Sequence, residues 1–376
     1  MKLKRILKWS ARVILVAVLA SGVWLFIAYW ASTNDCDRKT ALVNSMKAIV
    51  YCEYGSPDVL KFEDVEKPVP NDNQVLIKVR AASLNALDAY MIRDAWLNRL
   101  IFGLRKPRDM RLGRDVAGVV EAVGKNVTEF KPGDEVFGVC RGALAEYGCV
   151  SERGLVVKPA NVTFEQAASI PIAGLTALQG LRDKGKVQPG QKVLINGATG
   201  GVGTFAVQIA KSLGAEVTAV CSTRNVDLVR SIGADHVIDY TKEDFTKSDR
   251  RYDVIFDNVA NHSFGERRRV LNPKGICVLA GMGGAGVKQS EAMGRIVGNL
   301  FIARGLSSFT NQKFAQYMTR MSKQDLILLG DLIQAGKITP VIERTYKLSD
   351  APEALRQLDA GHARGKFVIT VEGESR

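Results

Sequence analysis

The sequence predicts an α/β protein with two domains, one built on a doubly wound parallel sheet and the other rich in antiparallel strands, behind an amino-terminal apolar helix. The chain has 376 residues, of which 46% are hydrophobic and 24% charged, so two ordinary domains can each bury a core. Short β-rich runs fill residues 46–160, and strands alternate with helical stretches between 165 and 280.

Residues 1–45 predict a basic segment followed by a membrane anchor. Residues 13–31 contain no charged side chain and approach the about 20 apolar residues that a helix needs to cross a bilayer. We therefore expect a single-pass membrane protein anchored through this stretch. The basic residues before it favour a catalytic domain outside the cytoplasm, whereas cofactor supply favours the cytoplasm, so the side stays open. Met46 is also a natural start for the globular part.

Residues 46–165 are expected to form a compact, antiparallel, barrel-like domain. Turn-forming residues such as Gly55-Ser56-Pro57 and Pro70-Asn71-Asp72 separate its β-rich runs. These runs are 48–51, 74–83, 118–124, 134–139 and 154–159.

Residues 166–309 are expected to form the parallel-sheet domain. A strand at 193–196 precedes a helix whose apolar residues recur at helical spacing: Val202, Phe205, Ala206, Ile209, Ala210 and Leu213. Further strands are expected at 216–221, 253–256 and 276–280. Residues 310–376 end in helical stretches and a last strand at 366–371.

The turn after strand 193–196 has the pattern of a dinucleotide phosphate site. Glycines let a backbone approach the pyrophosphate, and the following helix offers free N–H groups. Ala198 replaces the first glycine of the G-x-G-x-x-G pattern, but the strand before the turn and the amphipathic helix after it are the required context. We therefore predict a Rossmann domain that contacts the cofactor through Gly197, Thr199, Gly200, Gly201, Val202 and Gly203.

The end of strand 216–221 favours NADPH over NADH. A carboxylate there would bind the ribose hydroxyls and repel a 2′-phosphate. The chain instead has Ser222, Thr223 and Arg224, two hydroxyls and a guanidinium that suit a phosphate. The alternative is that Arg224 is an ordinary solvated residue at the start of the next helix.

In this order the motifs resemble the zinc-independent, quinone-oxidoreductase-like branch of the medium-chain dehydrogenase/reductases. The similarity runs from Met46 to Val371 and is carried by LGRDVAGVVEAVG, FKPGDEVFG, AASIPIAGLTAL, VLINGATGGVG, SIGADHVIDY and YDVIFDNVA. It implies a GroES-like substrate domain formed by 46–165 and 310–376, which encloses the Rossmann domain at 166–309. It also implies a cleft that binds a small-molecule substrate, and the group often forms homodimers.

The resemblance implies chemistry without a metal. Zinc-dependent relatives have a cysteine where this chain has Asn85, and a His-Glu pair where it has Arg114-Asp115; its three histidines form no cluster. Hydride delivery to a quinone or an activated C=C bond then fits better than alcohol oxidation. Asn85 is expected near the nicotinamide ribose or the substrate. Tyr90 is a candidate proton donor, with a purely structural tyrosine or water as alternatives.

The family resemblance also implies the remaining cofactor-binding residues. Thr176 is expected beside the nicotinamide, and Tyr240 is expected with Ser222 near the adenosine phosphate. The backbones of Val259 and Gly281 would line the nicotinamide pocket. NADPH-using relatives commonly have a lysine at the position of Val226. Without that lysine, Arg224 must bind the 2′-phosphate if the cofactor is NADPH.

Other functions can be weighed on the same residues. A short-chain dehydrogenase needs Tyr-x-x-x-Lys, which none of the nine tyrosines provides. A non-catalytic NADPH-binding scaffold or sensor stays open, as does a membrane-associated enoyl or lipid reductase, which the apolar segment and the basic run at 99–114 favour. No basic motif interleaved with aromatic residues suggests a nucleic-acid partner. The six cysteines form no C-x-x-C, so reduced thiols are expected.

Overall fold

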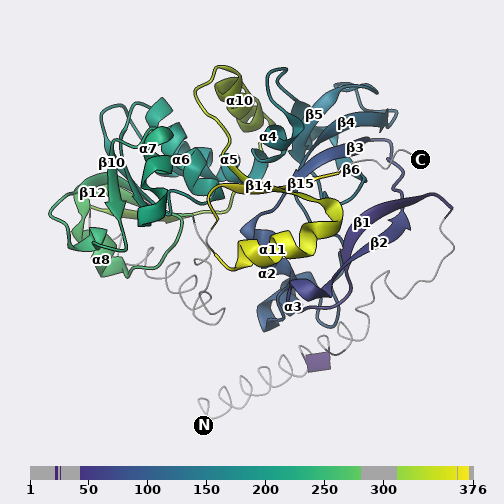
Figure 1. Cartoon of the computed structure of the whole chain (residues 1–376), viewed down its shortest axis with the longest axis horizontal. Coiled ribbons are helices and arrows are strands. Elements are labelled where there is room, and N and C mark those ends of the chain that lie inside the picture. The colour runs from purple at the N-terminus through teal and green to yellow at the C-terminus, as the bar shows by residue number, and fades with distance from the viewer. Residues whose placement is uncertain (1–21, 24–25, 27–42, 281–310, 362, 372–376) are drawn as a thin grey trace, which may run out of the picture.

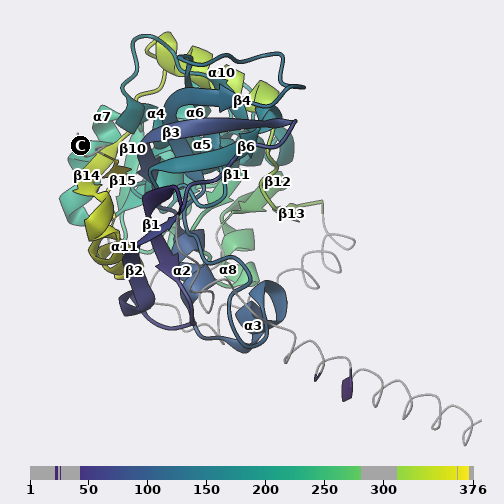
Figure 2. The same cartoon turned by 90° about the vertical axis from the view of Figure 1, so that its right-hand side faces the viewer.

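The computed structural model describes residues 22–23, 26, 43–280, 311–361 and 363–371. Two lobes lie side by side, one around a parallel sheet and one around a mainly antiparallel sheet (Figure 1). Seen after a quarter turn, the second sheet lies in front of the first lobe (Figure 2). Most of the expected membrane segment at 13–31 lies outside the described residues.

The first lobe has the predicted doubly wound sheet. Its strands are all parallel in the order β10-β9-β8-β11-β12-β13, which reverses between β8 and β11. β13 belongs to this sheet although it follows residue 310, where we expected the chain to leave the domain. The strands are β8 (Lys192–Asn196), β9 (Glu216–Cys221), β10 (His236–Asp239), β11 (Tyr252–Asp257), β12 (Leu271–Leu279) and β13 (Lys313–Gln316).

Helices cover this sheet, and α6 follows β8 as predicted. The apolar face of α6 is buried, with Phe205 and Ile209 in one core with Val193 and Ile195 of β8. The helices are α5 (Pro171–Leu178), which continues into a π-helical turn (Gln179–Lys184), α6 (Gly201–Ser212), α7 (Val226–Ser231), α8 (Phe264–Arg269) and α10 (Lys323–Gln334). Short 3-10 turns lie at Thr223–Asn225 and Phe245–Lys247.

The second lobe is built around β3 (Gln74–Ser83), which has the predicted bounds. The sheet order is β14-β15-β3-β4-β5-β7, with β6 also paired to β3, and only β14 and β15 are parallel within it. The other elements are β1 (Ser45–Tyr51), β2 (Leu60–Glu66), β4 (Asp115–Val123), β5 (Glu135–Val139), β6 (Tyr147–Ser151), β7 (Leu155–Val157), β14 (Ile342–Lys347), β15 (Lys366–Thr370), α2 (Ala86–Ile92), α3 (Trp96–Phe102), α4 (Phe164–Ala168), α11 (Ala351–Asp359) and 3-10 turns at Pro57–Val59, Glu152–Gly154 and Leu348–Asp350.

The C-terminal strand β15 joins the two lobes. It pairs antiparallel with β3, and Gly365 just before it forms a parallel bridge with Gly200 at the start of α6. Gly365 has φ +110°, and a Cβ there would lie 2.3 Å from the carbonyl oxygen of Val341, so this crossing requires glycine. The second lobe therefore touches the glycine turn directly.

Two expectations about the chain as a whole need correction. No helix in the described parts of the chain is long and apolar enough to span a bilayer; the longest, α6 and α10, have 12 residues each, against about 20 for a span. The expected transmembrane helix therefore has no support there. Cys140, Cys149, Cys221 and Cys277 are free as expected, but Cys52 is disulfide-bonded.

Candidate active site at the junction of the lobes

The glycine turn between β8 and α6 has two kinds of glycine. Gly197 has φ +80°, and a Cβ on Gly203 would lie only 2.0 Å from the carbonyl oxygen of Gly197, so both are needed for folding. Gly200 differs, since the nearest atom to an ideal Cβ there is 3.8 Å away and its φ is −72°. Folding does not require glycine at that position, whereas close approach by a ligand does. The turn thus fits a phosphate group held at the N terminus of α6.

The predicted adenosine-side residues follow β9. Asn225 Nδ2 donates to Ser222 Oγ at 3.1 Å, and Arg224 and Tyr240 are exposed. The Thr223 hydroxyl donates to the carboxylate of Asp239. Because that proton is used inside the protein, Thr223 is a poorer phosphate donor than the sequence indicated.

Sequence reasoning missed Asp239, which pairs with the last residue of β9 across the parallel sheet. Besides Thr223, its carboxylate accepts from the hydroxyl and the amide of Thr241, at 2.7 and 3.0 Å. The Thr223 hydrogen bond is the main cause that lowers the pKa of Asp239 to about 2. A negative charge therefore lies beside the residues that were predicted to bind the adenosine end of the cofactor. The sequence analysis assigned no strand to residues 236–239, and only the pairing of β10 with β9 in the folded sheet brings Asp239 beside Thr223.

The turn after β11 touches the glycine turn, because a Cβ on Gly197 would lie 2.7 Å from Val259 Cγ2. The buried Asp257 carboxylate holds this turn by accepting from the amides of Val259 and Ala260 at 3.1 and 2.8 Å. Arg267 Nε donates to its second oxygen at 2.6 Å. Val259 therefore lies beside the glycine turn, and its contact with a nicotinamide stays a prediction, while Gly281 lies outside the described residues.

The side chain of Asn85 is held by two charged partners at the start of α2. Its Nδ2 donates to Asp115 Oδ2 at 2.9 Å, and its Oδ1 accepts from Lys366 Nζ at 2.7 Å. The backbone N–H of Asn85 also donates to Asp88 Oδ2 at 2.8 Å, which caps the helix. Burial raises the pKa of Asp88 to about 6.

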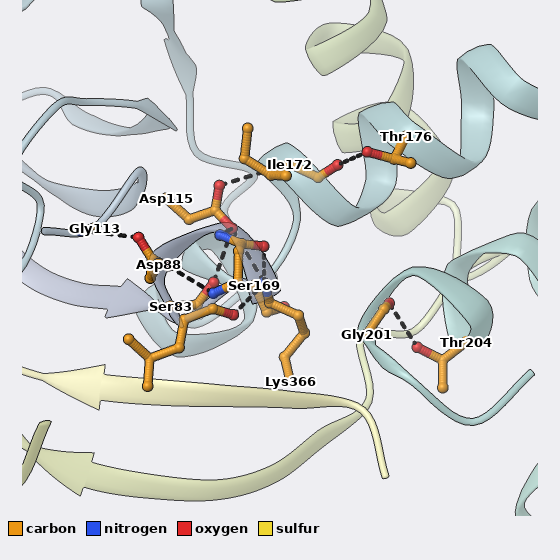
Figure 3. A network of polar contacts seen from close by, with 12 residues as sticks. Ser83, Asp88, Gly113, Asp115, Ser169, Ile172, Thr176, Gly201, Thr204 and Lys366 are labelled. Atoms are coloured by element: carbon orange, nitrogen blue, oxygen red, sulfur yellow. Dashed lines mark hydrogen bonds and ion pairs between the residues drawn. The ribbon is translucent and has the colours of Figure 1, made fainter. Parts of the chain in front are cut away.

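Asp115 is the centre of this polar network. Its Oδ2 also accepts from Ser83 Oγ at 2.9 Å and from Lys366 Nζ at 3.2 Å, and its Oδ1 accepts from the Ile172 amide at 3.0 Å. Figure 3 shows Ser83, Asp115 and Lys366 gathered together, with Gly201 and the start of α6 beside them. The Asp115 side chain is fully buried and that of Lys366 is 3% exposed. Such a pair persists only when its remaining hydrogen bonds are satisfied, as they are here.

Thr176 lies on α5, one helical turn beyond Ile172, which Asp115 binds. Its hydroxyl donates to the Ile172 carbonyl oxygen at 2.7 Å and lies 2.8 Å from Thr319 Oγ1. The network thus connects Thr176, Asn85 and the first turn of α6 at the junction of the lobes. Asp115 and Lys366 were not predicted as a pair; the only sequence signal was that each is a charged residue at the start of an apolar strand.

Tyr90 lies nearer the other end of α2. It is half-buried, burial raises the pKa of its hydroxyl, and its ring lies 5.2 Å from the Arg93 guanidinium. Arg93 forms an ion pair with Asp359 of α11. These contacts tie that end of α2 to the C-terminal helix and leave the role of Tyr90 in proton transfer a prediction.

The residues at the position of the zinc ligands do not fit a zinc ion. An amide and a carboxylate are present, and the ammonium of Lys366 already neutralises that carboxylate. Within the described residues, no group of three or more His, Cys, Asp or Glu side chains could hold a metal ion. Zinc prefers thiolate, imidazole and carboxylate ligands without a competing cation.

Known protein families match most of the chain. The GroES-like domain of alcohol dehydrogenases matches residues 71–160, and the zinc-binding dehydrogenase domain matches residues 232–369. The mitochondrial NAD(P)H oxidoreductase RTN4IP1 of Mus musculus is 37% identical over 87% of this chain and 89% of its own length. The chloroplastic NADPH-dependent alkenal/one oxidoreductase of Arabidopsis thaliana is 34% identical over 88% and 80%.

Among solved structures, the quinone oxidoreductase of Coxiella burnetii has a TM-score of 0.74 and 31% identity, covering 88% of this chain and all of its own. These matches correct the predicted localisation. The two curated relatives named above are a mitochondrial and a chloroplastic oxidoreductase by name, which contradicts the predicted single-pass membrane protein. No helix in the described residues is long and apolar enough to cross a bilayer.

Proposed function

Since the chain belongs to the medium-chain dehydrogenase/reductase family and is an NAD(P)H-dependent oxidoreductase, we propose that it uses NADPH, without zinc, to reduce a quinone or an activated C=C bond. The observation that carries this proposal is the Asn85–Asp115–Lys366 network. It sets a neutral hydrogen-bond donor where zinc-dependent relatives have a metal ligand.

The cofactor part of the proposal rests on the first lobe. Residues 197–203 would hold the pyrophosphate, with Gly200 leaving room for it. The 2′-phosphate would be bound by Ser222, Arg224 and Tyr240. The negative charge of Asp239, which accepts from Thr223, would weaken this binding by repulsion. The alkenal/one oxidoreductase that resembles this chain is named NADPH-dependent, which supports the same choice.

The reaction part rests on Asn85 of the second lobe and on Thr176 and Val259 of the first. The reduced nicotinamide, when bound, supplies a hydride. Asn85 would donate a hydrogen bond to the substrate oxygen on which negative charge develops, and Thr176 and Val259 would line the nicotinamide side. Reduction of a conjugated C=C bond or a quinone needs such a donor and a proton, for which water and Tyr90 are the candidates.

A substrate screen tests the proposal. Purified protein is mixed with NADPH or NADH and with quinones, enones and enoyl thioesters, and nucleotide oxidation is followed by absorbance. We expect NADPH oxidation with at least one acceptor class, and acyl-chain dependence would identify an enoyl reductase. Gly265→Ala, at a surface glycine whose Cβ would meet nothing within 4 Å, is the control variant. Calorimetric binding of neither nucleotide would refute the proposal.

A further inference from the structure

The chemistry of its partners leaves the Asn85 amide only one orientation. An ammonium can only donate hydrogen bonds, and a carboxylate can only accept them. Lys366 Nζ therefore faces the amide oxygen, and Asp115 Oδ2 faces the amide nitrogen. A flipped amide would place N–H groups against the ammonium and the carbonyl oxygen against the carboxylate.

Lys366 has no proton left for a ligand, whereas Asn85 has one. The three ammonium protons have three acceptors, namely Leu84 O at 2.9 Å, Asn85 Oδ1 at 2.7 Å and Asp115 Oδ2 at 3.2 Å. Asn85 Nδ2 carries two protons, and one bond to Asp115 is its only hydrogen bond within the described residues. Asn85 is half-buried, and Lys366 is buried.

The stem of Lys366 also touches the phosphate turn. An ideal Cβ on Gly201 would lie 2.8 Å from Lys366 Cδ, and the preceding Gly365 forms a bridge with Gly200. The Lys366 side chain thus reaches from the start of α6 to the side-chain amide of Asn85. It therefore fixes the position of that amide relative to the turn where the cofactor is expected.

We propose that Lys366 is a positioning residue for the reduction: it fixes the Asn85 amide so that an N–H, and not the carbonyl oxygen, faces the substrate oxygen that gains negative charge. The inference rests on the proposed function. A donor at that oxygen stabilises the transition state, whereas a flipped amide would repel it. Lys366 acts only through Asn85 and does not touch the substrate.

Lys366→Met tests this, because it keeps most of the stem and removes the ammonium. We expect kcat per nucleotide-binding site, counted by calorimetry, to fall about 10²-fold with an unchanged Kd for NADPH. The primary isotope effect with NADPH deuterated at the transferred position should not decrease. Lys158→Met is the matched control: Lys158 is also buried, donates to Val162 O at 2.7 Å and pairs with Glu135, but does not bind Asn85. It should keep the wild-type kcat per site.

A second readout does not require turnover. In the free protein, nuclear magnetic resonance should show slow exchange with solvent of the Asn85 side-chain amide proton that is bonded to Asp115 in the wild type, and faster exchange in Lys366→Met. If Lys366→Met does not fold, adding Asp115→Asn removes the unpaired buried charge, and the same loss of kcat is expected. A wild-type kcat per site, or unchanged amide exchange, would overturn the inference. A wild-type protein that reduces no acceptor would instead refute the proposed function, and the amide measurement would still test Lys366.

Discussion

The glycine turn and the Asn85 network lie side by side at the junction of the lobes, but they are built from different stretches of sequence. The turn comes from contiguous residues between β8 and α6, and its shape depends on local backbone conformation. The network joins Asp115 of β4 to Lys366 of β15, which are 251 residues apart. One half of the site is therefore local and the other exists only after the whole fold has formed.

Gly200→Val should give the largest effect on the local half. A Cβ there would lie no closer than 3.8 Å to the protein, so the Tm should stay close to wild type, while the side chain blocks the phosphate and weakens NADPH binding by more than about 10²-fold. Calorimetry and thermal unfolding measure both. Gly203→Val is the opposite control, because its Cβ would clash with Gly197 and should lower the Tm. Tight nucleotide binding by Gly200→Val would show that the phosphates lie elsewhere.

Arg224→Asp should have a smaller effect on the same half. A carboxylate there repels a 2′-phosphate and accepts hydrogen bonds from ribose hydroxyls. Asp239 nearby already accepts such a hydrogen bond from the Thr223 hydroxyl. The ratio of kcat/KM for NADPH over NADH should fall roughly 10- to 100-fold. Equal KM changes for both nucleotides would mean that Arg224 does not bind the phosphate.

Asp88→Asn tests the Asn85 network through the pH dependence of protein stability, because Asp88 accepts from the backbone N–H of Asn85. Burial raises the pKa of Asp88 from 3.8 to about 6, so the folded state binds more protons than the unfolded state between those values. The free energy of unfolding of the wild type should therefore fall as pH rises from about 4 to about 6, by at most about 3 kcal/mol relative to Asp88→Asn. Urea unfolding over that range measures it. Parallel pH curves for the two proteins would show that Asp88 titrates normally.

Removal of metal should have the smallest effect. Dialysis against a chelator is expected to leave kcat unchanged, because Lys366 neutralises the carboxylate that stands where zinc-dependent relatives have a ligand. Stoichiometric zinc whose loss abolishes turnover would contradict the account of the Asn85 network.

The same difference explains what the sequence could predict. Strands 74–83 and 216–221 were found with their observed bounds, and the glycine turn with its place before α6, because periodicity and turn residues are local signals. Asn85 was named only through the family resemblance, and its partner Lys366 was missed, because no local pattern links β3, β4 and β15. The charge of Asp239 beside Thr223 was missed for the same reason.

The crossing of β15 between the lobes has a consequence for synthesis of the protein. On the ribosome, Asp115 emerges 251 residues before Lys366, so the growing chain must carry that carboxylate without its counter-ion while the rest of the sheet assembles. Shortened translation products that stop before β15 should therefore have no functional Asn85 site, even where the nucleotide lobe is complete. Turnover in a cell extract would then report molecules whose translation had passed Lys366.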